Sequence, residues 1–436
     1  MQVSVETTTG LERKMTIGIP ASNIDSEVNK KLQELARTQK MAGFRPGKIP
    51  MSVINKRFGG HVRQDIMRDV MQRSYFDAVN QEKLQPAGQP HIEPSALEKG
   101  KDFEFTATFE IFPEVEVKPF ADLKIEKPVS VITDKDLDNM LSTLQKQRGT
   151  WEPIKRMAKK EDMVIIDFVG TIDGESFEGG TADDFSLILG SDSMIPGFEK
   201  QLLKVKKGDE VDVTVTFPED YQSAEVAGKE ALFNVVVKEA KSLTLPELDE
   251  EFVKLFGIDD GDVENLKEEI KNNMQRELDT TLKSKAKSNV LDSLNAANET
   301  ELPRALIDQE IEGLRQQAIQ QFSQGREGSI ADLPEMPTAL FEEQAKTRVK
   351  LALLVSEVIK KNDITVDPDR VRSTIEAAAA AYDEPEQMVN WYYSNQQQLQ
   401  QVESSVIEDQ VVDFILESAD VTEKNFNFDE LMNKQG

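Results

Sequence analysis

The stretch Gly43-Phe44-Arg45-Pro46-Gly47-Lys48-Ile49-Pro50 combines two glycines, two prolines, two cations and one phenylalanine in eight residues. Glycine and proline interrupt helices and favour turns, so the stretch is predicted to be a loop. Apolar residues at helical spacing precede it, over residues 27–41, and a second helical pattern follows Pro50. We therefore expect the loop to join two helices and to present its side chains outward.

Phe44 stands between cations, and this combination suits a surface that offers both an apolar pocket and negative charge. The alternative is an ordinary connector in which Phe44 folds back onto its own domain, and the residue types alone do not decide between the two. A phosphate-binding loop is excluded, because that motif needs four residues between its glycines and Ser or Thr after the lysine. Here three residues separate Gly43 from Gly47, and Ile49 follows Lys48.

The length and charge of the chain set limits on its function. It has 436 residues, of which 38% are hydrophobic, and this predicts two to four domains with cores of their own. The net charge of −28 argues against general binding of DNA or RNA. Residues 28–60, however, carry eight cations and one acid. One basic patch on an acidic protein favours a single polyanionic docking site, and the alternative is a solvated helix face.

Several kinds of chemistry lack the residues that they need. The chain has no cysteine, which excludes disulfides, thiolate zinc sites and cysteine nucleophiles. His61 and His91 have no second ligand at metal spacing, so both are interpreted as structural. No apolar run approaches the ~18 residues that a membrane span needs, and the start of the chain lacks a signal-peptide pattern. We expect no metal, no cofactor, no membrane partner and no DNA partner.

The pattern of strands and helices predicts a multidomain α+β protein. Residues 1–112 are expected to form an α+β domain with strands over residues 2–8, 13–19 and 103–110. Residues 113–149 are expected to be a connector that includes a helix over residues 133–148, capped by Thr133 or Asp134.

The second half of the chain changes character twice. Residues 150–245 alternate like a small antiparallel sheet folded over one short helix near residues 197–203. Residues 246–436 show helical periodicity, interrupted near residues 325–337, and are expected to form an all-α domain. Its last long helix is predicted to run from Glu386 to about Leu416.

Four pieces of the middle segment resemble FKBP-type prolyl isomerases in sequence and in spacing. They are Asp167-Phe168-Val169-Gly170, Asp173-Gly174-Glu175-Ser176-Phe177-Glu178, Phe185-Ser186-Leu187-Ile188-Leu189-Gly190 and Met194-Ile195-Pro196-Gly197-Phe198-Glu199. The resemblance implies a proline pocket lined by Phe168, Phe177, Phe185, Met194, Ile195, Phe198, Tyr221 and Phe233. Glu178 and Phe198 stand where better-known small members have Asp and Trp, so turnover is expected but drug-type ligands are expected to bind less well.

These residue types suit isomerisation of an X-Pro bond. Amide resonance gives that bond a barrier of ~18–20 kcal/mol, and twisting it needs no nucleophile or metal. A dry aromatic pocket grips the pyrrolidine ring, and a buried donor, for which Tyr221 is the candidate, stabilises the twisted form. The alternative is that the aromatic residues only fill a core, and spacing by itself favours that interpretation.

The whole chain resembles the trigger factor family of bacterial chaperones. The resemblance rests on Gly43-Phe44-Arg45-x-Gly47-Lys48-x-Pro50, Met1-Gln2-Val3-Ser4-Val5-Glu6, Val62-Arg63-Gln64-Asp65 and Pro86-Ala87-Gly88. It implies an ATP-independent chaperone that docks through Gly43, Phe44, Arg45, Pro46, Gly47 and Lys48. Pro46 departs from the basic residue that is common in relatives.

The family resemblance also implies the partners and the place of action. The docking site would be the large ribosomal subunit near the exit tunnel, including a ribosomal protein and adjacent ribosomal RNA. Nascent and unfolded polypeptides are the expected clients, a homodimer away from the ribosome is allowed, and the expected location is the cytoplasm.

The helical part carries apolar side chains near helix ends and interruptions. A concave surface of helical arms is implied by the resemblance, and an ordinary bundle is the alternative from sequence alone. The candidate client-binding residues are Phe322, Met336, Leu340, Met388, Trp391 and Tyr392. The rival function is a free prolyl isomerase whose flanking domains only recruit substrate.

Overall fold

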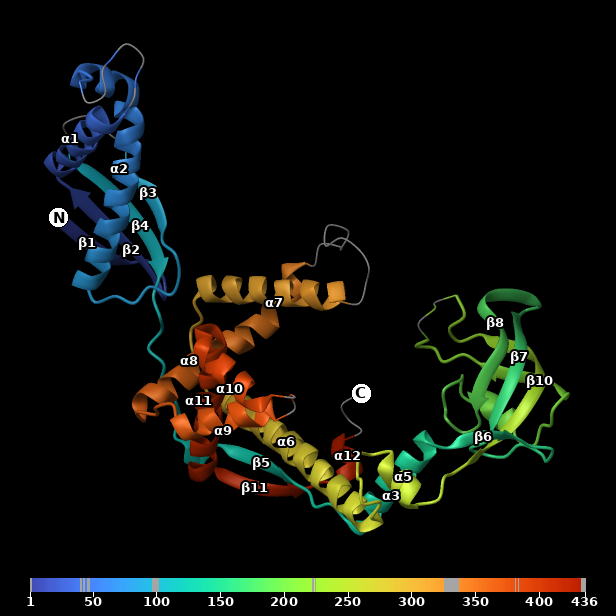
Figure 1. The fold of residues 1–436 in the computed structure, drawn as a ribbon. Helices are drawn as coiled ribbons and strands as arrows, with labels where there is room; N and C mark the ends of the chain where they lie inside the picture. The colour runs from blue at the N-terminus through green and yellow to red at the C-terminus, as the bar shows by residue number, and fades with distance from the viewer. Residues whose placement is uncertain are drawn as a thin grey trace. The chain divides into compact units, whose positions relative to one another are not determined.

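The computed structural model describes residues 2–39, 41, 44, 48–95, 102–221, 223, 225–324, 337–380, 382 and 384–432, without the side chains of Phe322 and Gln324. Contacts divide the chain into two compact units, and Figure 1 labels their main helices and strands. The first unit comprises Met1–Lys127 and Ser284–Lys424, and the second comprises Pro128–Lys283 and Asn425–Gly436. The predicted multidomain α+β class is confirmed.

The first unit begins with a four-stranded antiparallel sheet in the order β1-β2-β4-β3. Its strands are β1 (Gln2–Thr7), β2 (Glu12–Ile19), β3 (His91–Pro94) and β4 (Phe103–Glu110). The three strands predicted from alternation are confirmed to within a residue or two. The sequence does not predict β3, because its four residues include a proline and are too few to show a period; pairing with β4 defines it.

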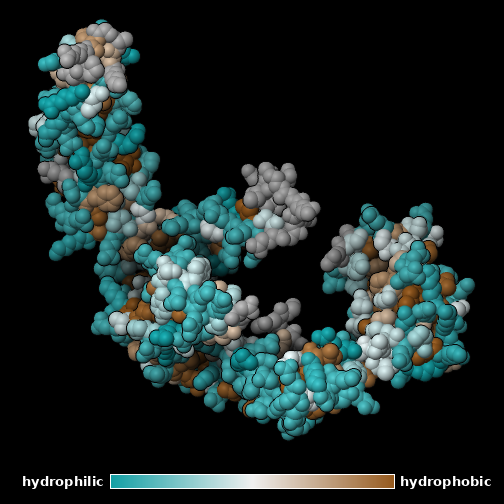
Figure 2. All heavy atoms as spheres, viewed as in Figure 1, coloured by the Kyte–Doolittle hydropathy of each residue, from teal (hydrophilic) through white to brown (hydrophobic). Residues whose placement is uncertain are grey.

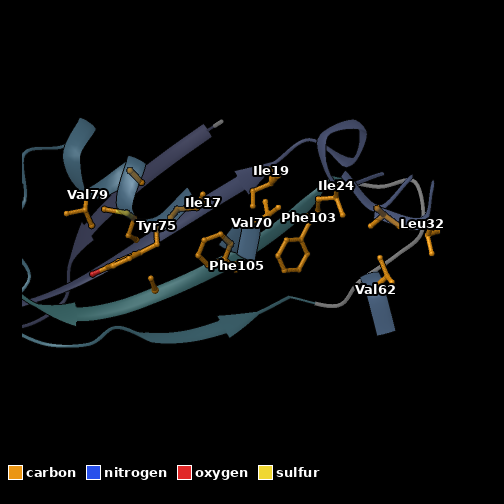
Figure 3. Close-up of a cluster of buried hydrophobic side chains, with 14 of the residues drawn as sticks. Ile17, Ile19, Ile24, Leu32, Val62, Val70, Tyr75, Val79, Phe103 and Phe105 are labelled. Atoms are coloured by element: carbon orange, nitrogen blue, oxygen red, sulfur yellow. The ribbon is translucent and has the colours of Figure 1, made fainter. Parts of the chain in front are cut away.

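Two helices pack on this sheet, α1 (Ala21–Thr38) and α2 (Met51–Gln81). They flank the loop stretch as predicted, although α1 begins earlier than expected because Ile24 is also buried. Alternate residues of β2 and β4 turn inward, so Ile17 and Phe105 meet Val70 of α2 in the core (Figure 3). The sheet and the two helices therefore form one hydrophobic core.

The rest of the first unit is mainly helical. It contains part of α6 (Val263–Ala297), α7 (Arg304–Gln324), the short 3-10 helix η3 (Thr338–Leu340), α8 (Glu342–Lys361), α9 (Pro368–Ala379), α10 (Pro385–Ser394) and α11 (Gln396–Ser418). Two strands, β5 (Lys124–Val129) and β11 (Asp420–Asn425), pair with each other. The sequence does not predict β11, whose residues are mostly polar and exposed.

The chain after β4 enters the helical core. Leu123 and Ile125 are almost fully buried among residues of α6, α8 and α11, including Leu294, Leu354 and Ile415. The side chain of Asn298 fixes the approach, since its Oδ1 accepts from the backbone N–H of Lys118 at 2.8 Å. The amino-terminal part of the predicted connector thus packs within the first unit.

The predicted helix from Glu386 to Leu416 is wrong, because the structure divides it into α10 and α11. The break lies at Asn395, whose side-chain oxygen accepts from the backbone N–H groups of Gln397 and Gln398. Asparagine is a favoured N-cap residue, so it starts a new helix where the periodicity alone continues the old one.

The second unit is built on a five-stranded antiparallel sheet in the order β6-β10-β7-β8, with β9 also paired to β10. Its strands are β6 (Thr150–Pro153), β7 (Met163–Ile172), β8 (Glu175–Ile188), β9 (Glu210–Thr216) and β10 (Glu230–Thr244). The short helix α4 (Phe198–Gln201) packs against this sheet, as predicted, and its Phe198 side chain is fully buried.

A second core in this unit joins helices from distant parts of the chain. They are α3 (Asp134–Gln147), α5 (Glu250–Lys254), the first half of α6 and α12 (Phe428–Met432). Thr133 caps α3 as predicted: its hydroxyl accepts from the backbone N–H of Asp136, whose carboxylate accepts in return from the backbone N–H of Thr133. The carboxyl-terminal part of the predicted connector therefore packs within the second unit.

The surface has the hydrophilic character that is expected of a highly charged sequence. The face drawn in Figure 2 is mostly hydrophilic, with hydrophobic residues scattered over it. Among the described residues, no helix combines the length and the apolar character that crossing a bilayer requires.

Candidate functional site

Three phenylalanine rings form the centre of the candidate site in the second unit. Phe168 of β7, Phe198 of α4 and Phe233 of β10 are 6%, 0% and 2% exposed. Their ring centroids lie 5.3–6.1 Å apart, and each pair meets edge to face. This arrangement directs the positive edge of one ring to the negative face of the next, which is the favourable geometry for aromatic pairs.

Glycines on β7 and β8 make room for the rings. A Cβ atom on Gly170 would lie 2.5 Å from the Phe233 ring, and one on Gly180 would lie 2.9 Å from the Phe177 ring. Contacts this short are not tolerated, so only glycine leaves room for the rings at these two positions. The glycine in the sequence piece Asp167-Phe168-Val169-Gly170 thus has a packing reason.

Other predicted residues surround the central rings and reach the surface. Phe185 is 37% exposed and meets Phe168 at 5.8 Å, while Tyr221 is 43% exposed and meets Phe217 at 4.9 Å. Phe177 is partly buried against Phe217 and Phe233. Partly exposed rings over a buried aromatic base leave an apolar surface on which a flat ring of similar size can pack.

At two predicted residues, Tyr221 and Glu178, the structure differs from a fully enclosed pocket. Tyr221 is not the buried donor that the sequence predicts, because its side chain is 43% exposed. Glu178 lies exposed on β8. Met194 and Ile195 are partly buried against the core of the sheet. The structure therefore brings the aromatic residues and Ile195 into one cluster, whereas Glu178 is a surface group beside it.

Phe217 belongs to this aromatic group and was missed from the sequence. It is 3% exposed and contacts both Phe177 and Tyr221 through its ring. The sequence does carry a signal, since Val213 and Val215 turn inward on β9 and Phe217, the residue after the strand, continues this alternation. Alternation predicts burial but does not show that a buried ring supports a surface one.

A buried carboxylate shapes the loop before α4. Glu199 is 6% exposed, and its oxygens accept from the backbone N–H groups of Gly190, Asp192, Ser193 and Met194 at 2.6, 3.2, 2.9 and 3.3 Å. Because Glu199 follows Phe198, this one side chain ties the loop that carries Met194 and Ile195 to the helix that carries the central ring.

The environment of Glu199 also determines its protonation. Burial alone would raise the pKa of its carboxyl, but the four backbone N–H groups outweigh burial and lower the pKa below its ordinary value of 4.5. The residue is therefore ionised at neutral pH, and the loop is held by charge-assisted hydrogen bonds.

The predicted docking loop is described only in part. Phe44 is 38% exposed and Lys48 is exposed, whereas Ile49 between Lys48 and α2 is buried in the core. Gly43, Arg45, Pro46 and Gly47 lie outside the described residues. Further exposed cations belong to the adjoining helices: Lys30, Lys31 and Arg37 on α1, and Lys56 and Arg57 on α2.

The candidate client-binding residues are not all alike. Leu340 is 71% exposed and Trp391 is 46% exposed, whereas Met388 is partly buried and Tyr392 packs on the core of α9–α11. Phe322 lies on α7, but its side chain is not described, and Met336 lies outside the described residues. The described members therefore combine exposed and partly buried apolar groups.

No group of three or more His, Cys, Asp or Glu side chains in the described part of the chain is arranged to hold a metal ion.

Comparisons with known proteins connect these observations. Residues 1–144 match the description "Bacterial trigger factor protein (TF)", and residues 262–417 match the carboxyl-terminal part of the same protein. Residues 154–238, which contain the aromatic cluster, match "FKBP-type peptidyl-prolyl cis-trans isomerase". A trigger factor of Pseudoalteromonas atlantica is 52% identical over 100% of both chains. The chain belongs to the trigger factor family. A trigger factor of Idiomarina loihiensis is 51% identical over 99% of both chains.

A solved structure of a trigger factor chaperone aligns with 96% of this chain and 99% of its own, at 20% identity and a TM-score of 0.48. As a member of the trigger factor family, the protein is a ribosome-associated chaperone that binds nascent polypeptides. It is also an FKBP-type prolyl isomerase, and the sequence-based expectation of both functions is confirmed.

Replacing Glu199 with Gln tests the role of the loop before α4. We expect Glu199→Gln to lower the free energy of unfolding of this unit by about 2 kcal/mol, because hydrogen bonds to a charged group are lost and an amide N–H faces backbone donors. Denaturant unfolding of the full chain at pH 7 measures the change. Glu210→Gln, which removes a charge from an exposed position on β9, is the matched control.

The loss of stability expected for Glu199→Gln also depends on pH. Since the folded-state pKa of Glu199 is lowered, its stabilising contribution is complete above the ordinary value of 4.5 and is lost as the pH falls through the lowered pKa. The stability difference between wild type and Glu199→Gln should therefore shrink in acid. A difference that stays constant down to low pH would contradict the assignment.

Proposed function

We propose that the basic, aromatic tip between α1 and α2 docks this chaperone on the large ribosomal subunit beside the exit tunnel. The observation that carries the proposal is the partly exposed Phe44 side chain, together with exposed cations on the two helices that flank it in the sequence. The residues proposed to make the contact are Gly43, Phe44, Arg45, Pro46, Gly47 and Lys48. A ribosomal protein offers an apolar pocket for the ring, and adjacent ribosomal RNA offers phosphates for the cations.

The aromatic cluster of the second unit is proposed to hold the proline of a client. Phe168, Phe198 and Phe233 support the pyrrolidine ring from below, while Phe177, Phe185 and Ile195 contact it from the sides. The Tyr221 hydroxyl donates to a carbonyl next to the X-Pro bond, and its partial exposure lets an extended chain reach it. Glu178 acts at the edge of the site. Binding the twisted amide more tightly than the planar one lowers the barrier to rotation.

Client segments are proposed to bind the exposed apolar residues of the helical part. Leu340 and Trp391 are the most exposed of the described candidates, and Phe322, Met336, Met388 and Tyr392 complete the proposed set. Scattered apolar groups bind unfolded segments weakly and with little preference for one sequence, which suits a chaperone that must release its clients without ATP.

We propose four functional segments: residues 1–112 for docking, residues 113–149 as a connector that packs with the helical part, residues 150–245 for isomerisation and residues 246–436 for client binding. The ribosomal partner places the protein in the cytoplasm.

Away from the ribosome, a homodimer would cover exposed residues such as Leu340. Sedimentation velocity of the free protein at micromolar concentration tests this, and a purely monomeric boundary would refute the homodimer.

Ribosome co-sedimentation tests the docking proposal. Wild type should pellet with ribosomes at moderate salt, and Phe44→Ala/Arg45→Ala should stay in the supernatant because both the apolar and the charged contact are lost. Lys83→Ala, which removes an exposed cation beyond the far end of α2, is a control that should pellet like wild type. If the double variant pellets equally well, the docking surface lies elsewhere on α1 and α2.

A second experiment separates the chaperone from the rival function of a free isomerase. Phe198 is fully buried, and truncating such a ring typically costs about 3–5 kcal/mol, so Phe198→Ala would test folding rather than chemistry. Phe185→Ala is the sharper change, because its ring is partly exposed.

We expect Phe185→Ala to lower kcat/KM for an X-Pro peptide by about tenfold, because a positioning contact is lost. Suppression of client aggregation, followed by light scattering, should stay close to wild type. Leu340→Ala/Trp391→Ala should show the opposite pattern. Loss of both activities in Phe185→Ala, with the fold intact, would instead support the free isomerase.

A further inference from the structure

Two β-bulges in the five-stranded sheet of the second unit lie on either side of β7, close to Asp167. On one side, Asp183 and Asp184 of β8 both stand opposite Asp167 alone, which makes a β-bulge. On the other side, Lys238 is the extra residue of a bulge on β10. These two bulges interrupt the strands that neighbour β7, as labelled in Figure 1. Bulges re-aim side chains, so they define where the following residues point.

The side chain of Lys238 reaches across β7 and joins the two bulges. Its Nζ lies 2.8 Å from Oδ1 of Asp167 and 2.8 Å from Oδ1 of Asp184. The same Asp167 oxygen accepts from the backbone N–H of Asp184, also at 2.8 Å. One ammonium group and one backbone N–H therefore converge on Asp167, and the three residues form a closed set of contacts.

The backbone at Asp184 needs this support. Its φ is +54°, a left-handed conformation that is unfavourable for a residue with a Cβ atom. The next residue is Phe185, whose ring meets Phe168 at 5.8 Å and an interplanar angle of 82°. A change of backbone conformation at Asp184 would move the Phe185 ring away from the aromatic cluster.

We propose that Lys238, Asp167 and Asp184 are positioning residues that hold Phe185 at the edge of the prolyl isomerase site. None of the three belongs to the aromatic cluster, and their effect on the reaction passes through the Phe185 ring. The inference rests on the proposed role of Phe185 in isomerisation. According to this inference, a polar cluster on the outer face of the sheet determines the position of Phe185 in an apolar site on the inner face.

The cluster keeps its charges at neutral pH. The hydrogen bond from Lys238, followed by that from the Asp184 backbone, lowers the pKa of the Asp167 carboxyl. Hydrogen bonds to the carboxylates of Asp167 and Asp184 raise the pKa of Lys238. These groups are partly exposed, and exposed ion pairs contribute little to stability. The expected consequence of breaking the cluster is thus a change in the site rather than a loss of folding.

The test uses the full-length protein and a proline-containing peptide. We expect Lys238→Met to lower kcat/KM about tenfold, because small displacements of positioning groups reduce rates strongly. Lys238→Arg, which keeps the cation, should restore most of the activity. Lys207→Met is the matched control: it removes the cation of the Lys207–Glu239 pair, whose atoms lie 3.8 Å apart, and should leave kcat/KM unchanged. Circular dichroism and the melting temperature verify that each variant is folded.

A double-mutant cycle decides whether the effect passes through Phe185. In a Phe185→Ala background, Lys238→Met should cause no further loss of kcat/KM, because the ring that it positions is already absent. An equal loss in both backgrounds, or no loss in the wild-type background, would overturn the proposal. If Phe185→Ala itself leaves kcat/KM unchanged, the role of Phe185 and this proposal are both wrong. If Phe185→Ala lowers kcat/KM but the cycle shows no coupling to Lys238→Met, Phe185 has its proposed role and the positioning cluster does not.

Discussion

The burial of Leu123 and Ile125 among α6, α8 and α11 is the contact on which the first unit depends. It brings the chain that leaves the amino-terminal sheet into the core made by helices from the second half of the sequence. These two side chains are 3% and 1% exposed, so neither can be replaced by a polar residue without leaving an unpaired group inside the core. The helical part is consequently not a separate segment of sequence, because its core includes residues that precede the isomerase region.

The second unit shows how a core can also serve as the base of a site. Phe168, Phe198 and Phe233 stabilise the sheet by packing, and the same rings are proposed to support a bound proline. The two interpretations that the sequence leaves open, core or pocket, are therefore not exclusive. Rings at the base are nearly fully buried, whereas Phe185 and Tyr221 at the edge remain partly exposed. This gradient of burial separates the residues that hold the fold from those available to a client.

The sequence predicts most of what depends on periodicity. The alternating strands of the first sheet, the α1–α2 pair, the cap at Thr133 and the helix α4 all follow from local patterns. The four spaced pieces around Phe168 identify the aromatic cluster by resemblance. Local patterns do not predict the pairing of β3 with β4 or of β11 with β5, because each depends on a partner strand elsewhere in the chain. They also miss the cap at Asn395 and the carboxylate of Glu199 that accepts from four backbone N–H groups, because a single polar side chain that bonds nearby backbone leaves no periodic signal. The same holds for Lys238, which in the sequence is one cation among many.

The pairing of β5 with β11 has a consequence for the order in which this protein folds. The side chains of Glu126 and Lys424 lie 2.8 Å apart and are separated by 298 positions along the chain. During synthesis, the strand at residues 124–129 emerges long before its partner, so this part of the first unit cannot close until residues 420–425 have been made. The isomerase sheet, whose strands lie within residues 150–244, can form earlier, since its contacts are closer in sequence. A chaperone of nascent chains is therefore itself a nascent chain in which β5 remains unpaired until β11 has been made.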